Sequence, residues 1–372
     1  MKIAQLVPSM ESGGVERGCL EISSWLRAQG HEALVVSGGG RLVQNLERSG
    51  SRHHHLATGM KNPKALIQAL RLRRWLKQAR LDILHVRSRM PAWVTKLALA
   101  GWRPSRRPRV VTTVHGLYSV SGYSRVMTSG EIVICVSEAV REYVLANYRK
   151  VDAEKLRVIP RGIDPGVYFP EYRPDSSWWE AWGRDYPQTM GKRWITLPGR
   201  VTRLKGHAPF LRVLTQLEDP DIHGVIVGDV RSVKQAYALE MRELAQRLGV
   251  ADRVTWVGHR DDLRDILAAS SVVVGLSTKP EAFGRTSLEA LALGKPVVAF
   301  DHGGAAEVLR SMFPNGLVAL GNEDDVVSRC RWALEHRPEP TLLPYEYTLE
   351  AMLTSIGGVY QDLTQPPHSF LP

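Results

Sequence analysis

Two cations follow a short apolar run in the second half of the chain. Trp194–Leu197 is predicted to be a strand, and the run GRVTRLKG comes soon after it, with Arg200 and Lys205 five residues apart between Gly199 and Gly206. Arginine donates a fork of hydrogen bonds and lysine supplies a mobile point charge, so the pair suits a diphosphate. The order of residues is not that of a Walker loop, and an exposed basic loop is the alternative interpretation.

Two glutamates flank the predicted start of a helix in the run EAFGRTSLE. The helix is expected to begin near Gly284, so the backbone N–H groups of Gly284, Arg285 and Thr286 would form an anion site at its positive end. Glu281 precedes the helix, where it could accept hydrogen bonds from sugar hydroxyls, and Glu289 lies more than one turn inside it, where it could bind a ribose diol. The alternatives are that Glu281 caps the helix and that Glu289 lies on a solvated face.

Three other motifs give weaker evidence for an anion-binding or metal site. Ser12-Gly13-Gly14 follows the predicted strand Ile3–Val7 and leads into a helix, which lets backbone N–H groups approach an anion, although such pairs also make simple turns. Asp219-Pro220-Asp221 has the letters of a metal motif but lies in a proline-broken loop. His53-His54-His55 is interpreted as a surface or edge run, because tetrahedral metal sites need spaced ligands. The sequence therefore predicts no metal site.

Strands that alternate with helices place these motifs at strand ends, and they predict an α/β fold with parallel strands and crossover helices. The turn-rich run 160–174 separates two Rossmann-like halves, residues 1–165 and 166–345, and a tryptophan-rich insert opens the second. The predicted strands are Ile3–Val7, Ala33–Ser37, Asp82–Val86, Val110–Val114, Ile132–Ser137, Trp194–Leu197, Gly224–Val227, Val254–Val257, Val272–Leu276 and Pro296–Phe300, and Arg157–Ile159 breaks the pattern before the linker. The predicted helices are Val15–Gln29, Pro63–Ala79, Pro91–Ala100, Glu138–Asn147, His207–Leu217, Val233–Leu248, Asp262–Ala268, Arg285–Leu293, Asp324–His336 and Thr348–Leu363.

Taken in order, these motifs cover nearly the whole chain and resemble the retaining glycosyltransferases of family four, which have the GT-B fold. The resemblance is carried by Gly13-Gly14, by His115-Gly116, by Arg200 with Lys205, and by two glutamates separated by seven residues. Its most specific part is PEAFGRTSLEALALGKP, residues 280–296. The run VIPRGID, residues 158–164, resembles the family's interdomain segment, although the family usually has asparagine where this chain has Arg161.

The resemblance implies a central cleft between the two domains, the first for the acceptor and the second for the nucleotide sugar. It also implies that the last helix, within residues 346–372, packs back on the first domain. Arg200 and Lys205 would neutralise the departing diphosphate, and Glu281 would position the transferred sugar. His115 would lie by that sugar, near the reaction centre.

The remaining implied roles concern the bound donor. Gly13 and Gly14 would allow its close approach to the first domain, and Glu289 would bind the ribose. The other residues implied at the donor are Gly258, His259 and Arg260 by the nucleobase, and Phe283, Gly284, Arg285 and Thr286 by the distal phosphate.

The charge of the chain is concentrated in one segment. Between Lys61 and Arg109 there are 14 basic residues and one acid, Asp82, a local excess of +13 in a chain whose net charge is +11. Leucines and tryptophans are interleaved in a helical pattern, so the segment could lie on an anionic membrane surface or hold the phosphates of an acceptor. A solvated helix face is the simpler alternative. Nucleic acid ranks last as a partner, since no nucleic-acid-binding motif is present.

The composition, the cysteine spacing and the N-terminal run indicate the cellular compartment in which the protein is expected. The 372 residues are 44% hydrophobic, enough for two ordinary cores, and three widely spaced cysteines rule out a disulfide framework. The N-terminal run lacks the features of a signal peptide, and no apolar stretch approaches the roughly 18 residues of a membrane span. A cytoplasmic protein, peripheral on the inner face of the cytoplasmic membrane, is expected.

The sequence therefore predicts a retaining hexosyltransferase that uses a nucleotide-sugar donor, with a UDP-sugar favoured, and that needs no metal or other cofactor. The basic segment favours an anionic, lipid-linked or envelope-glycan acceptor such as lipopolysaccharide core. Two alternatives stay open: a sugar-nucleotide epimerase or hydrolase on the same fold, and a non-catalytic basic protein that binds a membrane surface.

Overall fold

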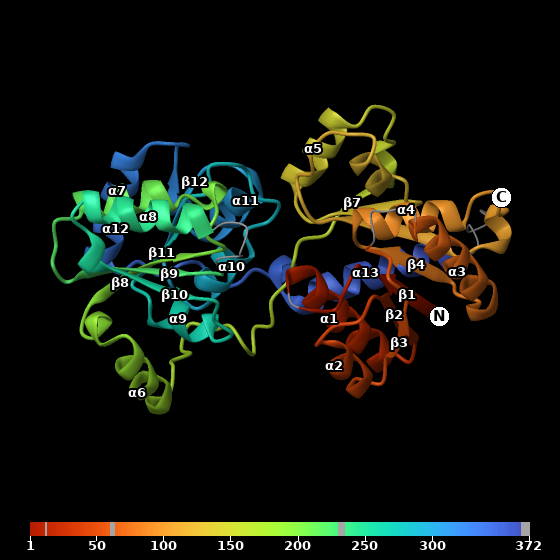
Figure 1. The fold of residues 1–372 in the computed structure, drawn as a ribbon, viewed down its shortest axis with the longest axis horizontal. Helices are drawn as coiled ribbons and strands as arrows, with labels where there is room; N and C mark the ends of the chain where they lie inside the picture. Colours follow the sequence, from red (N-terminus) through yellow and green to blue (C-terminus); the bar gives the residue numbers. More distant parts are fainter. Residues whose placement is uncertain (12, 60–63, 230–234, 366–372) are drawn as a thin grey trace, which may run out of the picture. The chain divides into compact units, whose positions relative to one another are not determined.

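Short runs rich in valine and isoleucine form two parallel sheets, one in each of two units of the chain (Figure 1). The structure, a computed structural model, describes residues 1–11, 13–59, 64–229 and 235–365. The first unit comprises Met1–Pro160 and the segment from Glu350 onward, and the second comprises Arg161–Leu349. The boundaries predicted from the sequence, 165/166 and 345/346, lie a few residues from these. The predicted class, two parallel α/β units, is confirmed.

The first unit is built on a seven-stranded parallel sheet with the order β3-β2-β1-β4-β5-β6-β7. Its strands are β1 (Lys2–Leu6), β2 (Glu32–Ser37), β3 (Arg52–His55), β4 (Ile83–Val86), β5 (Arg109–Val114), β6 (Ile132–Cys135) and β7 (Leu156–Val158). Its helices are α1 (Gly14–Ala28), α2 (Val43–Arg48), α3 (Lys64–Ala79), α4 (Arg89–Ala98), α5 (Glu138–Asn147) and, at the end of the chain, α13 (Leu349–Thr364).

The last helix is part of the first unit, although most of the second unit precedes it in the chain. Tyr360 of α13 places its hydroxyl 2.6 Å from Nδ1 of His85 on β4, and Nε2 of the same ring lies 2.6 Å from Oγ1 of Thr113 on β5. All three side chains are buried, and burial, with the nearby Arg87 guanidinium, holds the pKa of His85 well below its usual value. A neutral histidine therefore links α13 to the centre of the sheet.

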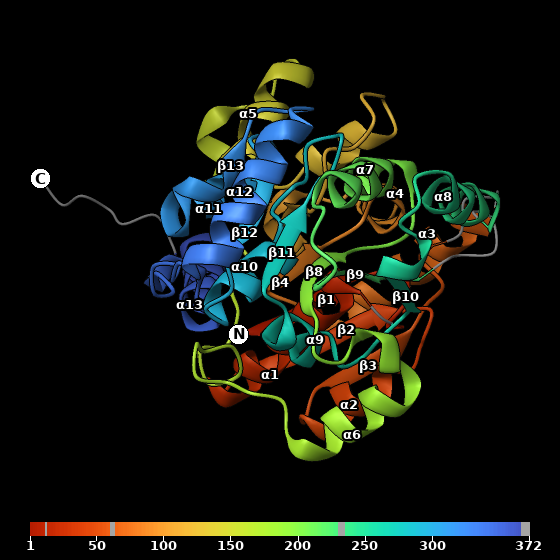
Figure 2. The same ribbon diagram turned by 90° about the vertical axis from the view of Figure 1, so that its left-hand side faces the viewer.

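The second unit is built on a six-stranded parallel sheet with the order β10-β9-β8-β11-β12-β13 (Figure 2). Its strands are β8 (Arg193–Pro198), β9 (Ile222–Val227), β10 (Val254–Gly258), β11 (Val272–Gly275), β12 (Val297–Phe300) and β13 (Leu317–Val318). Its helices are α6 (Ser176–Asp185), α7 (His207–Gln216), α8 (Gln235–Arg247), α9 (Leu263–Ala269), α10 (Arg285–Ala292), α11 (Gly303–Met312) and α12 (Glu323–His336). Helices α7, α8 and α12 pack on one face of the sheet (Figure 1). Helices α9, α10 and α11 contact one another in series on the other face.

The strand order reverses once in each sheet, and this reversal determines where a ligand can bind. The chain leaves β1 toward β2 on one side and later adds β4 on the other; β8 has the same position between β9 and β11. The loops that follow the two central strands diverge there and leave a crevice at the carboxyl ends of the strands. Gly13 and Gly14 follow β1, Lys205 follows β8, and Glu281 follows β11. The predicted site residues therefore lie at the edges that the topology selects.

Six strands and α-helices among the described residues were not predicted: β3, β7, β13, α2, α6 and α11. The histidine run forms β3, an edge strand in which His53 Nε2 lies 2.9 Å from Ser37 Oγ and the ring of His54 stacks on Trp75. An edge strand needs no continuous apolar run, so its sequence looks like a loop. The tryptophan-rich insert is helix α6, which begins after Asp175, whose carboxylate accepts a hydrogen bond from the Trp178 N–H.

Two adjacent glycines of α13 provide a test of how that helix docks. A methyl group on Gly357 would lie 2.4 Å from the ring of Trp25, whereas one on Gly358 would meet nothing within 4 Å. We expect Gly357→Ala to lower the free energy of unfolding by about 1–3 kcal/mol through overpacking. Gly358→Ala should raise it by up to about 1 kcal/mol, because alanine favours helix. Urea unfolding monitored by circular dichroism measures both changes, and equal effects of the two substitutions would contradict this packing.

Candidate functional site

A crevice opens at the carboxyl edge of the second sheet, at the reversal between β8 and β11. It is bounded by the ends of β8 and β11, by the first turn of α10 and by the start of α11. The lining side chains that can take part in polar chemistry include Lys205, Ser277, Glu281, Thr286 and His302. Two of these residues, Ser277 and His302, were not predicted.

A tight turn after β8 positions Lys205. The turn is a short 3-10 helix, Arg203–Lys205, and Gly206 follows it with a φ of +76°. A Cβ on Gly206 would lie 1.9 Å from the carbonyl oxygen of Leu276, so glycine alone allows the turn to pack against the end of β11. From there Lys205 Nζ reaches to 2.7 Å from Glu281 Oε1. The ammonium of one loop and the carboxylate of the next thus form an ion pair at the centre of the crevice.

The backbone of Glu281 is held by the start of α11. The Gly304 N–H donates to the Glu281 carbonyl at 2.8 Å. A Cβ on Gly303 would lie 2.6 Å from that carbonyl oxygen, and one on Gly304 would lie 2.4 Å from the carbonyl oxygen of Ala282. The pair Gly303-Gly304 therefore permits a close backbone contact that positions the glutamate, which explains two glycines at the start of a helix.

Two further side chains surround the carboxylate. The Ser277 hydroxyl donates to Glu281 Oε1, the same oxygen that Lys205 contacts. His302 precedes α11 and lines the crevice, and its Nε2 lies 2.7 Å from the Ser277 carbonyl oxygen. No sequence motif indicated His302, because its role depends on the approach of the loop after β12 to the loop after β11.

The protonation state of Glu281 follows from these contacts. Burial raises the pKa of its carboxyl, but the Lys205 ammonium and the hydrogen bonds from Lys205 and Ser277 outweigh burial and lower the pKa below its usual value. Glu281 is therefore ionised at neutral pH. A negative oxygen held in this way can accept hydrogen bonds from sugar hydroxyls, and the adjacent ammonium remains available to a negatively charged ligand.

Helix α10 begins beside the ion pair. Gly284 precedes its first turn with a φ of +81°, and a Cβ there would lie 2.5 Å from the Ala305 Cβ. Thr286 lines the crevice, so the positive end of the helix borders the site. Glu289 is buried and accepts a hydrogen bond from Arg285 Nε at 2.9 Å. The alternative interpretations of the two glutamates are wrong, because Gly284 rather than Glu281 caps the helix and Glu289 is not solvated.

Five other residues of the second unit that were predicted at the donor site do not line the crevice. Arg200 is exposed on the loop after β8. Gly258 ends β10 with a φ of +71°, and His259 Nε2 lies 3.4 Å from Asp261 Oδ1 at the surface. Arg260 donates to both carboxylate oxygens of Asp262, at 2.8 and 2.6 Å. Phe283 is buried, with its ring centroid 6.1 Å from that of Tyr347.

The predicted site residues of the first unit lie at the carboxyl edge of its own sheet. Gly13 precedes α1 with a φ of +153°, a conformation that favours glycine, and Gly14 begins the helix. Ser12 lies outside the described residues. His115 follows β5, and its backbone N–H donates to the Tyr118 hydroxyl at 3.4 Å.

The weak metal motif has another explanation. Lys192 Nζ lies 3.1 Å from Asp221 Oδ1, and Arg193 pairs with Asp219, so both carboxylates neutralise cations at the start of β8. They lie at the opposite edge of the sheet from the crevice. Over the described ranges, no group of three or more histidine, cysteine, aspartate or glutamate residues is arranged to hold a metal ion.

Comparison with known proteins identifies the family. Residues 12–167 match the model described as Glycosyltransferase Family 4, and residues 180–343 match the model described as Glycosyl transferases group 1. Two parallel α/β units of this order are the architecture of the GT-B glycosyltransferases. The chain belongs to glycosyltransferase family 4.

Curated relatives match over part of their length. The chain is 32% identical to alpha-maltose-1-phosphate synthase of Mycolicibacterium smegmatis, over 55% of this chain and 52% of that protein. It is 31% identical to the lipopolysaccharide core biosynthesis mannosyltransferase LpsB of Rhizobium meliloti, over 41% of this chain and 42% of that protein. The matches thus span about half the length of these two relatives or less.

Solved structures match over nearly the whole chain. A glycosyltransferase from Rickettsia africae is 28% identical with a TM-score of 0.85, and the match covers 98% of both chains. HepE of Anabaena, solved in complex with UDP and glucose, is 21% identical with a TM-score of 0.77, over 97% of this chain and 100% of that one. The likeness to HepE shows the fold.

The contribution of the ion pair in the crevice to the free energy of unfolding should depend on pH. Lys205→Met leaves the Glu281 carboxylate without its cation, so its pKa should rise and the free energy of unfolding should fall by about 1–3 kcal/mol at pH 7. The pKa of Glu281 in the folded protein is lowered from 4.5, so the stabilisation is complete above that pH and is lost as the pH falls through the lowered pKa. The difference between wild type and Lys205→Met should therefore shrink in acid.

Urea unfolding of both proteins between pH 3 and pH 7 measures this difference. Lys192→Met is the matched control, because Lys192 pairs with an aspartate at the surface. Its effect should stay below about 0.5 kcal/mol across this pH range. A Lys205→Met effect that is independent of pH would contradict the assigned ion pair.

Proposed function

We propose that this protein transfers a hexose from a nucleotide sugar, with a UDP-sugar favoured, to an anionic acceptor, and that the configuration of the transferred sugar is retained. One observation carries the proposal: Lys205 and Glu281 form an ion pair where the loops after β8 and β11 diverge, beside the start of α10. A nucleotide sugar presents a diphosphate and a ring of hydroxyls on either side of one bond. The crevice offers a cation and a helix N-terminus for the first, and an ionised carboxylate for the second.

Charge separation determines the role of each group. When the bond between sugar and phosphate breaks, positive charge develops on the sugar ring and negative charge on the nucleoside diphosphate. Lys205, Arg200 and the backbone N–H groups at Gly284–Thr286 stabilise that negative charge. Glu281 accepts hydrogen bonds from the hydroxyls of the transferred sugar and holds its ring in place. These groups supply the positive charge that the leaving group needs, so the proposed reaction requires no bound metal or other cofactor.

Retention follows from attack on the face that the leaving group vacates. The best-placed carboxylate, Glu281, has its Oε1 occupied by Lys205 and Ser277, which favours a positioning role over that of a covalent nucleophile. The departing phosphate then accepts the proton of the acceptor hydroxyl. In this proposal, Glu289 binds the ribose, and Gly258–Arg260 lie by the nucleobase. In the first unit, the roles given to Gly13, Gly14 and His115 stay predictions from the sequence.

The acceptor is inferred from charge and from one relative. The excess of basic residues between Lys61 and Arg109 suits a phosphorylated or lipid-linked envelope glycan. The matched relative LpsB is a lipopolysaccharide core mannosyltransferase, which supports an acceptor of the lipopolysaccharide core type. We accordingly propose a cytoplasmic location on the inner face of the cytoplasmic membrane. Among the described residues, no helix is both long and apolar enough to cross a membrane.

Nucleotide binding tests the donor site without knowledge of the acceptor. UDP in large excess should raise the Tm of the wild-type protein, because a ligand that binds only the folded state stabilises it by mass action. Lys205→Met should abolish most of that rise. Glu281→Gln should keep UDP binding but lower turnover of the sugar nucleotide by about 100- to 1,000-fold. Differential scanning fluorimetry and a UDP-release assay measure these effects.

Lys192→Met should behave as wild type in both assays. A rise in Tm with GDP or ADP but not with UDP would change the base assignment, and no response to any of them would contradict the donor site. Appearance of an epimerised donor without any acceptor would favour the epimerase alternative.

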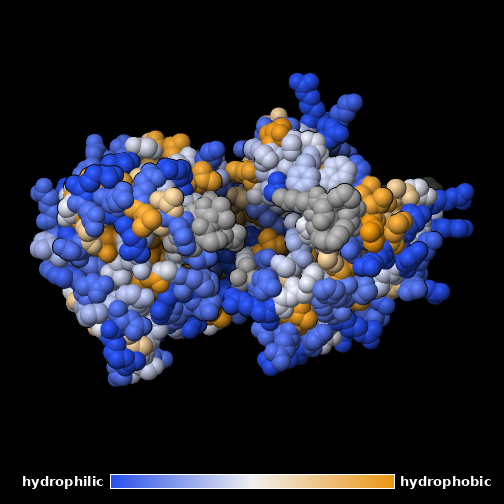
Figure 3. Space-filling model, in the orientation of Figure 1, coloured by the Kyte–Doolittle hydropathy of each residue, from blue (hydrophilic) through white to orange (hydrophobic). Residues whose placement is uncertain are grey.

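The basic face of α3 provides a test of membrane contact. Leu66, Ile67 and Leu70 are 50–58% exposed, and Arg71, Arg74 and Lys77 are exposed on the same helix. Figure 3 shows hydrophobic side chains gathered over the α3–α4 region. An apolar patch bordered by cations suits an anionic bilayer. Arg73 is excluded from the test, because it donates to the Ala98 and Ala100 carbonyl oxygens and is structural.

We expect the combined change of Arg71, Arg74 and Lys77 to glutamine to weaken binding to anionic liposomes at least tenfold, since each cation near such a surface contributes about 1 kcal/mol. The control variant changes Arg184, Arg242 and Arg247 of the second unit to glutamine, which removes the same charge from exposed positions elsewhere. Liposome co-sedimentation measures both variants. Equal loss in the two variants would show that net charge alone is responsible, and no loss in the first would contradict membrane docking through α3.

A further inference from the structure

The first unit contains a cavity of about 330 Å³ that the proposed reaction does not use. It lies between α4 and the sheet, and its polar end is formed by residues that precede β5 and β6. That end is the amino edge of the sheet, opposite the edge at which Gly13, Gly14 and His115 lie. Much of its wall is apolar, formed by Val86, Ala92, Leu99, Trp102 and Val110. The volume falls in the range of roughly 300–1,000 Å³ that is usual for small-molecule sites.

One residue that lines this cavity has a buried hydroxyl without a hydrogen-bond partner. Thr95 of α4 is 3% exposed, and its Oγ1 has no hydrogen-bond partner among the described residues. Buried polar atoms are almost always hydrogen-bonded, and an unpaired one costs free energy. Because Thr95 itself lines the cavity, a rotation about its Cα–Cβ bond would let this hydroxyl donate to a ligand oxygen there.

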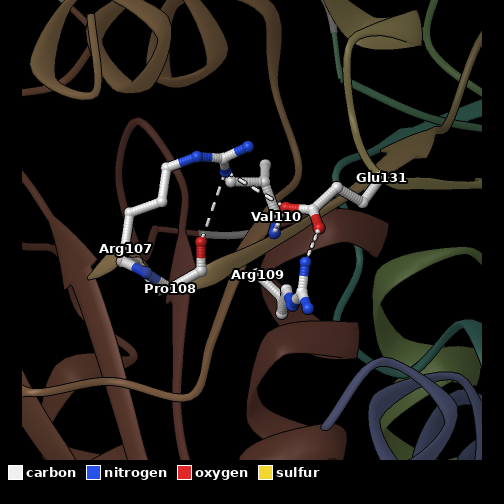
Figure 4. A network of polar contacts seen from close by, with 5 residues as sticks. All are labelled: Arg107, Pro108, Arg109, Val110 and Glu131. Carbon is white, nitrogen blue, oxygen red and sulfur yellow. Dashed lines mark hydrogen bonds and ion pairs between the residues drawn. The ribbon is translucent and has the colours of Figure 1, made fainter. Parts of the chain in front are cut away.

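The polar end of the cavity carries net positive charge. Its lining acid, Glu131, accepts hydrogen bonds through Oε1 from Arg107 at 3.1 Å and from the Val110 N–H at 3.2 Å, and through Oε2 from Arg109 at 2.8 Å (Figure 4). One carboxylate is thus shared between two guanidinium groups. Lys96, which also lines the cavity, adds another cation. The head of a ligand at this end would meet an excess of positive charge.

From these observations we infer that the cavity binds a single-chain aliphatic anion, with its chain along Val86, Ala92, Leu99 and Val110 and its head-group oxygens at Thr95, Lys96 and Arg107. The apolar wall selects the chain, and the unpaired hydroxyl and the cations select the head. Phosphate and carboxylate heads share this chemistry. The inference concerns a site within the first unit alone and does not depend on the proposed transfer reaction.

Chain length provides the sharpest measurement. Each methylene group that enters an apolar site contributes about 0.8 kcal/mol, so the affinity for alkyl phosphates should rise about fourfold per added carbon from hexyl to decyl phosphate. Isothermal titration calorimetry below the critical micelle concentration measures these affinities. Inorganic phosphate should not bind at the same concentrations, and decyl glucoside, which has a neutral head, should bind at least tenfold more weakly than decyl phosphate.

Substitutions locate the site. Ala92→Leu fills the cavity and should weaken the binding of decyl phosphate at least tenfold. Leu97→Phe is its control, because Leu97 lies exposed on the same helix and does not line the cavity. Thr95→Val removes the hydroxyl with little change of shape and should weaken binding severalfold without loss of stability, so it tests the site even where Ala92→Leu folds poorly. Lys205→Met should leave binding unchanged, which separates this cavity from the donor site.

Four results would overturn the inference. The first is that both Ala92→Leu and Thr95→Val bind decyl phosphate with wild-type affinity. The second and third are that the wild-type protein binds inorganic phosphate, or decyl glucoside, as tightly as decyl phosphate. The fourth is that the affinity does not change between hexyl and decyl phosphate.

Discussion

The ion pair between Lys205 and Glu281 is the interaction on which the site in the second unit depends. Each partner belongs to a different loop, one after β8 and the other after β11, and the two loops diverge because the strand order reverses between these strands. Burial alone would raise the pKa of the Glu281 carboxyl, and the adjacent Lys205 ammonium reverses that effect. The pair therefore fixes both loops and keeps opposite charges ready within one crevice. Sheet topology and electrostatics specify the same place.

Close backbone contact makes this pair possible. Gly206 lets the turn with Lys205 meet the end of β11, Gly284 lets α10 begin against α11, and Gly303-Gly304 let α11 meet the loop with Glu281. In each case a Cβ would lie within about 2.6 Å of another atom, which real side chains do not tolerate. Glycines therefore allow the loops of the crevice to approach one another closely, and this approach positions the charged side chains.

The first unit has a buried, hydrogen-bonded centre and one segment that is rich in basic residues. Buried His85 ties the last helix to the sheet through Tyr360, so the end of the chain stabilises a unit that begins at residue 1. The basic residues of the segment 61–109 have several roles. Arg73 caps the end of α4, Arg107 and Arg109 share Glu131, and Arg71, Arg74 and Lys77 remain exposed. The net charge of a segment therefore overstates the charge that its surface offers to a partner.

The sequence alone predicts the alternation of strands and helices, the approximate division into two units, and the residues Lys205, Glu281, Gly284 and Glu289. These features are local, because each depends on a period of apolar residues or on a motif within one loop. The elements it misses carry no such signal: β3 is a polar edge strand, and α11 begins with two glycines whose purpose lies in another loop.

Only the tertiary structure brings Ser277 and His302 to Glu281 and pairs Arg285 with Glu289. It also turns Asp219 and Asp221 toward Lys192 and Arg193 and leaves Thr95 unpaired beside a cavity. The physical reason is that contacts between loops depend on which strands become neighbours and on how closely two backbones can approach. The order of residue types along the chain specifies neither the neighbouring strands nor the distance between two backbones.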